Sequence, residues 1–128
     1  MKIKKFEDIE SWKRARRLTN KIYQTTGTGK FAHDFGLKDQ IRRASISILS
    51  NIAEGFERGG DKEFLQFLAM AKGSCGEVRA QLYIALDQGY LAEEIFEELS
   101  KNAVEIGQLL SGFMKYLSNS QLRGSKYR

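Results

Sequence analysis

The 128-residue chain contains no proline, one cysteine, one histidine and one tryptophan. Because proline breaks helices, its absence permits long uninterrupted ones. The single cysteine, Cys75, excludes an internal disulfide and is typical of proteins from the reducing cytosol, so we expect a cytoplasmic location. The chain also lacks a run of about 18 apolar residues and an apolar leader segment, so we expect neither a membrane-spanning helix nor a secretory signal.

The residues that carry most enzyme chemistry are scarce. His33 is the only histidine, so the Glu-x-x-His pairs of di-iron bundle enzymes are absent from the sequence. Cys75 falls on an apolar helical stripe, which favours an inert buried thiol over a nucleophile. Gly27 and Gly29 lack the strand context that a phosphate-binding loop requires. We therefore expect no catalytic centre, no metal site and no cofactor.

Charge is missing from the middle of one expected helix, residues 37–58. No charged residue falls between Arg43 and Glu54. A surface helix of a single domain normally presents a charged face to water along its whole length. This segment is therefore expected to bury one face in its own domain and the other against a partner. The core face is Leu37, Ile41, Ala44, Ile48 and Ile52, and the partner face includes Ile46, Leu49 and Ala53.

Four segments have the periodicity of amphipathic helices, at about residues 8–25, 37–58, 62–88 and 92–118. Short glycine-containing links separate the last three, and short links make successive helices antiparallel. The pattern predicts an all-α, antiparallel up-down-up-down four-helix bundle. We expect one domain, residues 1–118, and a polar, basic and mobile tail, residues 119–128. The core stripe of the first helix is expected at Ile9, Trp12, Ala15, Ile22 and Tyr23, and that of the fourth at Ile95, Leu99, Asn102, Ile106, Leu109, Phe113 and Leu117.

The third helix carries a line of small residues opposite its apolar core stripe: Ala69, Gly73, Gly76 and Ala80. Glycine inside a helix costs about 1 kcal/mol relative to alanine, and close approach of another helix is a benefit that can compensate. Two interpretations are open, an interface between subunits and a close crossing within the chain. We favour the subunit interface because the core stripe already accounts for the packing inside the bundle.

Four polar residues border or follow the uncharged segment of the second helix. Asn51 is expected on the core side, where a buried amide sets helix register through hydrogen bonds. Arg42 and Arg43 can pair with carboxylates across an interface or bind phosphate. With Glu54 they are interpreted as structural residues at the polar ends of an interface.

Positive charge is concentrated in two parts of the chain, whose net charge is +5. Residues 1–58 contain 13 basic and seven acidic residues, and residues 121–128 contain three basic and no acidic ones. Such a distribution is compatible with nucleic-acid contact and equally with an ordinary solvated surface. The candidate nucleic-acid contacts are Lys13, Arg14, Arg17 and Lys21 in the first helix and Arg123, Lys126 and Arg128 in the tail.

The run GLKDQIRRASISILSNIAEG, followed by KEFLQFLAMAKGS, carries a family resemblance. With the opening that includes Trp12 and Lys13, it resembles the four-helix bundle proteins related to those encoded by intervening sequences of bacterial large-subunit (23S) ribosomal RNA genes. The chain is also distantly similar to the accessory variability protein of diversity-generating retroelements. Two departures from the family pattern are Leu49 and Ala32, which stand where proline is common, so a weaker kink is expected in the second helix.

The resemblance implies a small cytoplasmic bundle that assembles as a homopentamer and has no established catalytic residues. It also implies contact with nucleic acid, since the related accessory protein engages a reverse transcriptase and RNA. A pentamer would multiply the net charge to about +25 and attract phosphate backbones. We therefore expect a non-enzymatic homo-oligomer that binds RNA or another nucleic acid through the basic surface of the first helix and the C-terminal tail. The alternative is a protein scaffold or accessory subunit that docks an acidic partner protein.

Overall fold

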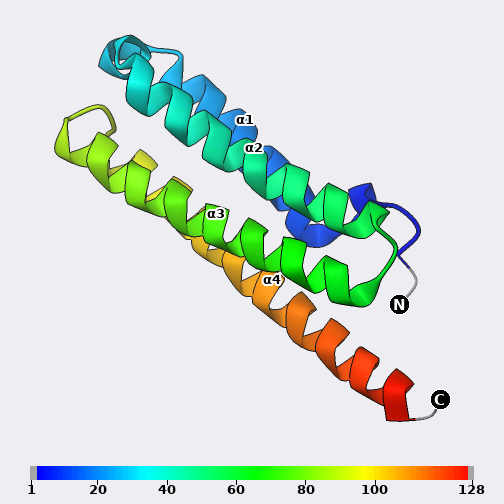
Figure 1. The fold of residues 1–128 in the computed structure, drawn as a ribbon. Coiled ribbons are helices and arrows are strands. Elements are labelled where there is room, and N and C mark those ends of the chain that lie inside the picture. Colours follow the sequence, from blue (N-terminus) through cyan, green and yellow to red (C-terminus); the bar gives the residue numbers. More distant parts are fainter. Residues whose placement is uncertain (1–2, 127–128) are drawn as a thin grey trace.

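The computed structural model describes the backbone of residues 3–126 and the side chains of residues 3–119. Over this range the chain forms two short 3-10 helices, η1 (Phe6–Asp8) and η2 (Gly29–His33), and four α-helices. The α-helices are α1 (Glu10–Thr26), α2 (Phe35–Glu57), α3 (Asp61–Asp87) and α4 (Glu93–Lys126). Figure 1 shows the four long helices running alternately up and down the molecule. The expected all-α four-helix bundle is confirmed.

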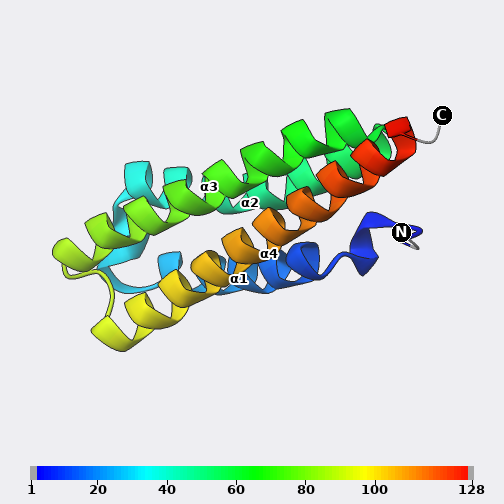
Figure 2. The same ribbon diagram turned by 90° about the horizontal axis from the view of Figure 1, so that it is seen from below.

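Each α-helix packs against two neighbours. The α1 helix lies beside α2 and α4, and α3 lies beside the same two helices. Figure 2, a view from below, shows α3 and α4 nearest the viewer, with α2 behind α3 and α1 behind α4. α2 is continuous through Leu49, in keeping with the absence of proline. The links after α2 and α3 turn at Gly59 (φ +84°) and Gly89 (φ +76°), a left-handed conformation that glycine adopts without strain.

Asp34 ties together the end of the bundle that contains η2. Its Oδ1 accepts a hydrogen bond from the backbone N–H of Leu37 at 3.1 Å and so caps α2. Its Oδ2 accepts a hydrogen bond from the Tyr90 hydroxyl at 2.9 Å. That bond favours the neutral phenol and raises the pKa of Tyr90. One carboxylate therefore joins the start of α2 to the link between α3 and α4.

The cores of α2 and α3 lie where the sequence predicts them. All five expected residues of α2 are buried. The apolar periodicity of α3 predicts a core stripe of Phe64, Phe67, Leu68, Ala71, Cys75, Val78, Leu82 and Ala85, and all of these are buried except Phe67, which is half-buried. Tertiary packing therefore follows the apolar periodicity directly in these two helices, whose buried polar residues, Ser45 and Ser74, are small.

The expected core of α1 is wrong at Tyr23, which is 39% exposed, whereas Trp12 is half-buried and packs against the edge of the core. Leu18, Thr19 and Thr26 are buried instead. The threonines tolerate burial because their hydroxyls donate to backbone carbonyls of α1, Thr19 to Ala15 at 2.8 Å and Thr26 to Ile22 at 2.7 Å.

The expected core of α4 is displaced around the helix. Leu99, Ile106 and Leu117 are buried as predicted, but Ile95 is 39% exposed and Asn102 and Leu109 are only half-buried. Ala103 and Leu110, each one residue further along the chain, are buried in their place.

α4 is longer than the sequence predicts, because its backbone stays helical to Lys126 instead of ending near Ser118. Its C-terminal part extends past the ends of the other helices (Figure 1). The side chains of Arg123 and Lys126, and all of Arg128, lie outside the described residues, so their part in binding and the mobility of the tail stay predictions. None of the helices described here combines the length and apolarity needed to cross a membrane.

Candidate nucleic-acid interface

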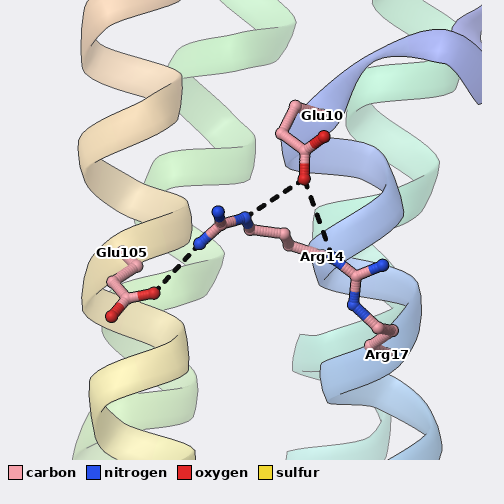
Figure 3. A network of polar contacts seen from close by, with 4 residues as sticks. All are labelled: Glu10, Arg14, Arg17 and Glu105. Atoms are coloured by element: carbon pink, nitrogen blue, oxygen red, sulfur yellow. Dashed lines mark hydrogen bonds and ion pairs between the residues drawn. The ribbon is translucent and has the colours of Figure 1, made fainter.

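One side of α1 has its positive charge neutralised by carboxylates. Figure 3 shows Arg14 between Glu10 and Glu105, with its Nε 3.2 Å from the first carboxylate and its Nη1 3.0 Å from the second. Arg17 also approaches Glu10, at 3.6 Å. Further along, Lys21 pairs with Glu98 of α4. Three of the four cations predicted on α1 are therefore engaged in ion pairs.

These ion pairs are exposed and individually weak. The side chains of Arg14 and Arg17 are 42% and 64% exposed, and exposed pairs typically contribute 0.2–1 kcal/mol each. They enclose a cleft of about 140 Å³ between α1 and α4, which is small for a nucleotide. This side of α1 joins α1 to α4 through ion pairs and offers only a small cleft as a binding surface.

The adjoining side of α1 is different, because two of its three cations form no ion pair among the described side chains. Lys13 and Arg16 form no ion pair with any residue whose side chain is described. They border a cavity of about 420 Å³, called here the Trp12 cavity, which is lined by Glu7, Trp12, Lys13, Arg16, Arg17 and Asn20.

Trp12 is held in place at this cavity by an aromatic contact. The Phe6 ring of η1 packs edge-on against it, with centroids 5.1 Å apart and planes at 69°. The Arg16 guanidinium lies 6.0 Å from the centre of the indole. Sequence reasoning missed Arg16 and Asn20 and assigned Trp12 to the core. The four-residue spacing of Trp12, Arg16 and Asn20 was the available signal, since such residues share one helix face.

The small-residue line on α3 faces outward. Ala69, Gly73, Gly76 and Ala80 are all exposed. A Cβ atom added at Gly73 or at Gly76 would meet nothing within 4 Å. The interpretation as a close crossing within the chain is therefore wrong for the part of the molecule that the structure describes. The interpretation as a subunit interface stays a prediction.

The expected interface residues of α2 lie on another side of the bundle. Ile46 is 40% exposed, and Leu49 and Ala53 are half-buried. Ile46, Leu49 and Ala53 lie four, seven and eleven residues after Arg42, a spacing that places them on the same side of α2. Arg42 contacts α1, so this is the side of α2 next to α1. Ser47, by contrast, faces α3 and accepts a hydrogen bond from Ser74 at 2.9 Å. The α2 and α3 residues thus belong to two separate surfaces.

The four polar residues of α2 all have partners within the chain. Arg42 donates to Thr26 Oγ1 at 2.8 Å and to the Tyr23 carbonyl at 3.2 Å, and its guanidinium stacks 4.2 Å from the Tyr23 ring centre. Its role is to join the end of α1 to α2. Half-buried Asn51 donates to the backbone carbonyl and the hydroxyl of Ser47. The two remaining residues pair within the helix, Arg43 with Asp39 and Glu54 with Arg58.

Cys75 is buried in the core stripe of α3. Burial raises the pKa of its thiol to about 12, although the nearby Arg79 acts in the opposite direction. A thiol in this state is a poor nucleophile at neutral pH. Among the described residues, His, Cys, Asp and Glu side chains form no group of three that could hold a metal ion.

Comparison with known proteins places these features in a family. A family model described as 23S rRNA-intervening sequence protein matches residues 7–112. The crystal structure of a protein of unknown function from the S23 ribosomal protein family of Bacteroides thetaiotaomicron VPI-5482 has a similar fold, with a TM-score of 0.75. The two chains are 22% identical, over 82% of this chain and 98% of that one. No curated protein matches.

The family match covers well over half of the chain and includes the Trp12 cavity as well as α2 and α3. It confirms the resemblance seen in the sequence motifs. The chain belongs to the family of 23S rRNA-intervening sequence proteins.

Proposed function

We propose that this protein is a non-enzymatic homo-oligomeric helical bundle that binds RNA through the Trp12-cavity side of α1. The observation that carries the proposal is the pair of exposed cations, Lys13 and Arg16, that no carboxylate of the described residues neutralises. Cations of this kind displace counterions from phosphate backbones, which is the main source of affinity in such complexes. The basic tail, with Arg123, Lys126 and Arg128, is proposed as a second contact.

Assembly is the second part of the proposal. A ring of more than two subunits needs two different complementary surfaces on each subunit. The outer line of α3 supplies one, since it is small in the middle and flanked by exposed Met70, Tyr83 and Ile84. The side of α2 with Ile46, Leu49 and Ala53 supplies the other. A pentamer, as the family resemblance implies, would carry a net charge of about +25.

A salt titration of RNA binding tests the first part. The probe is a fluorescently labelled structured RNA, and its anisotropy is followed as protein is added at several salt concentrations. The double variant Lys13→Glu/Arg16→Glu is expected to bind about tenfold or more weakly, with a shallower dependence of affinity on salt. Binding by the wild-type protein that does not weaken between low and moderate salt contradicts the proposal.

The matched control is Lys62→Glu/Lys101→Glu, which changes the net charge equally. Both lysines are exposed, on α3 and α4, and neither has an ion-pair partner among the described side chains. The control is expected to lose much less affinity than the α1 variant. Equal losses would show that only total charge matters and that α1 is not the binding face.

A groove between α3 and α4 favours the alternative, a scaffold for an acidic partner protein. It has a volume of about 470 Å³, a floor that includes Gly76, Ala103 and Gly107, and the cations Lys72 and Arg79 at its border. A partner that stays bound in a pull-down after nuclease treatment, and is lost on Lys72→Glu/Arg79→Glu, supports this function over RNA binding.

A further inference from the structure

The Trp12 cavity contains groups that phosphate binding alone does not require. An indole ring forms part of its wall, and a carboxylate, Glu7, and an amide, Asn20, stand beside the three cations. We propose that the cavity takes a single unpaired nucleobase of an RNA strand, with Trp12 as the stacking platform. This inference rests on the proposed RNA binding and specifies single-stranded RNA as its ligand.

The aromatic platform is supported by Phe6, has the Arg16 guanidinium over its ring at 6.0 Å, and also lines the cavity. Phe6 packs edge-on against Trp12 and holds the indole against the bundle. The half-buried indole also lines the cavity, so part of its surface faces the space in which a ligand would lie. Unpaired bases stack on such aromatic rings in single-strand binding proteins, irrespective of sequence, because every base has a π face.

Helical spacing distributes the other groups around the platform. Arg16 and Asn20 follow Trp12 at intervals of four residues, and Lys13 and Arg17 form the neighbouring line. The cations are suited to the phosphates on either side of a stacked base. Asn20 can both donate to and accept from a base edge, and Glu7 can accept from an amino or imino group.

The size of the cavity and the contrast with the other side of α1 support the assignment. About 420 Å³ falls within the range of ordinary small-ligand pockets. The cleft between α1 and α4 is also lined by cations, yet it has no aromatic residue and a third of the volume. A duplex keeps its base faces stacked inside the helix, so a cavity with an indole wall discriminates in favour of unpaired RNA.

Trp12 is the only tryptophan in the chain, so its fluorescence reports on the cavity directly. The experiment adds a single-stranded oligouridylate of about eight nucleotides, or a duplex RNA of the same length, to the full chain. Indole fluorescence and the anisotropy of a label on the RNA are recorded together. The single strand is expected to quench Trp12, whereas the duplex is expected to bind without quenching.

Two variants complete the test. Trp12→Leu, checked for folding by circular dichroism, is expected to weaken single-strand binding about tenfold and to leave duplex binding unchanged. Asn20→Ala alters an exposed residue away from the core, and it is expected to weaken single-strand binding to a smaller extent while fluorescence quenching remains.

The two levels of the proposal fail in different ways. RNA that binds by anisotropy without quenching Trp12 overturns the nucleobase site and leaves RNA binding in place. Equal quenching by single strand and duplex also overturns it. An anisotropy that stays constant with both RNAs overturns RNA binding itself, together with the nucleobase site.

Discussion

Glycines on the inner side of α2 and on the outer side of α3 occupy opposite environments. A Cβ atom at Gly55 would lie 2.6 Å from the Cβ of Phe67 and 2.9 Å from Cδ1 of Phe64. At Gly73 or Gly76 an added Cβ would meet nothing within 4 Å. All three lie inside helices, where glycine costs about 1 kcal/mol relative to alanine.

The difference shows which of these costs is compensated within the chain. Gly55 allows α2 and α3 to approach closely, and the aromatic residues of α3 fill the space. Gly73 and Gly76 bring no neighbour of the described chain closer. Their outer surface is the one proposed above to pack against a partner subunit. Gly55 thus serves packing inside the bundle, and Gly73 and Gly76 are assigned to the proposed packing between bundles.

Replacing Gly55 should have the largest effect on folding. In Gly55→Ala the new methyl group overlaps the first side-chain atom of Phe67, which only a backbone shift can relieve. We expect a loss of about 1–3 kcal/mol in the free energy of unfolding, measured by urea denaturation. The control is Gly112→Ala in α4, where nothing lies within 4 Å and a gain of up to about 1 kcal/mol is expected. Equal effects would remove the distinction between the two sites.

Filling the outer line of α3 should act on assembly and leave folding intact. Gly73→Leu places a large side chain where a neighbouring subunit is proposed to pack, and we expect the dissociation constant to rise about tenfold or more. Light scattering at micromolar concentrations measures the change, with Gly112→Leu as the matched control on α4. A wild-type protein that is monomeric under these conditions would refute the proposed assembly.

The last effect is absent at neutral pH and concerns Cys75, the inner neighbour of the outward-facing Gly76. Its pKa is raised from an ordinary value of 9.0 to about 12 in the folded protein. The unfolded chain therefore releases this proton first, so the thiol lowers the stability as pH rises from about 9 to 12 and has no effect below 9. The free energy of unfolding of Cys75→Ala should decline less steeply with pH over that interval than that of the wild type.

Reactivity with a thiol reagent gives an independent measurement of the same feature. At pH 8 the folded protein should react far more slowly than the urea-unfolded chain, because the thiol is both buried and protonated. Equal rates in the two states would show that the inner side of α3 is open to solvent.

The sequence predicted α2 and α3 well and the flanking helices less well, for identifiable reasons. In α2 and α3 the inner positions are apolar or small, so periodicity alone located the core. In α1, Thr19 and Thr26 are buried because they satisfy their hydroxyls on the backbone of their own helix. Composition cannot distinguish such threonines from exposed ones.

The candidate binding site was predicted in part. The sequence located positive charge on α1 and named Lys13 and Arg17 among the candidates. It could not show that Arg14 and Lys21 face carboxylates of α4, since Glu105 and Glu98 lie 91 and 77 residues away along the chain. Nor could it show that Arg16 has no ion-pair partner among the described side chains, because an ion pair depends on which helix lies alongside.

Periodicity, glycine links and the absence of proline were sufficient to determine four antiparallel helices, because these are local properties of the chain. Sequence motifs were sufficient to determine the family. Tertiary structure alone decided which side of α1 keeps its charge and that Trp12 stands at a cavity. It also decided that Gly55 is packed while Gly73 is open. The physical reason is that neutralisation, burial and close approach depend on residues brought together from different helices, and the local sequence does not specify those neighbours.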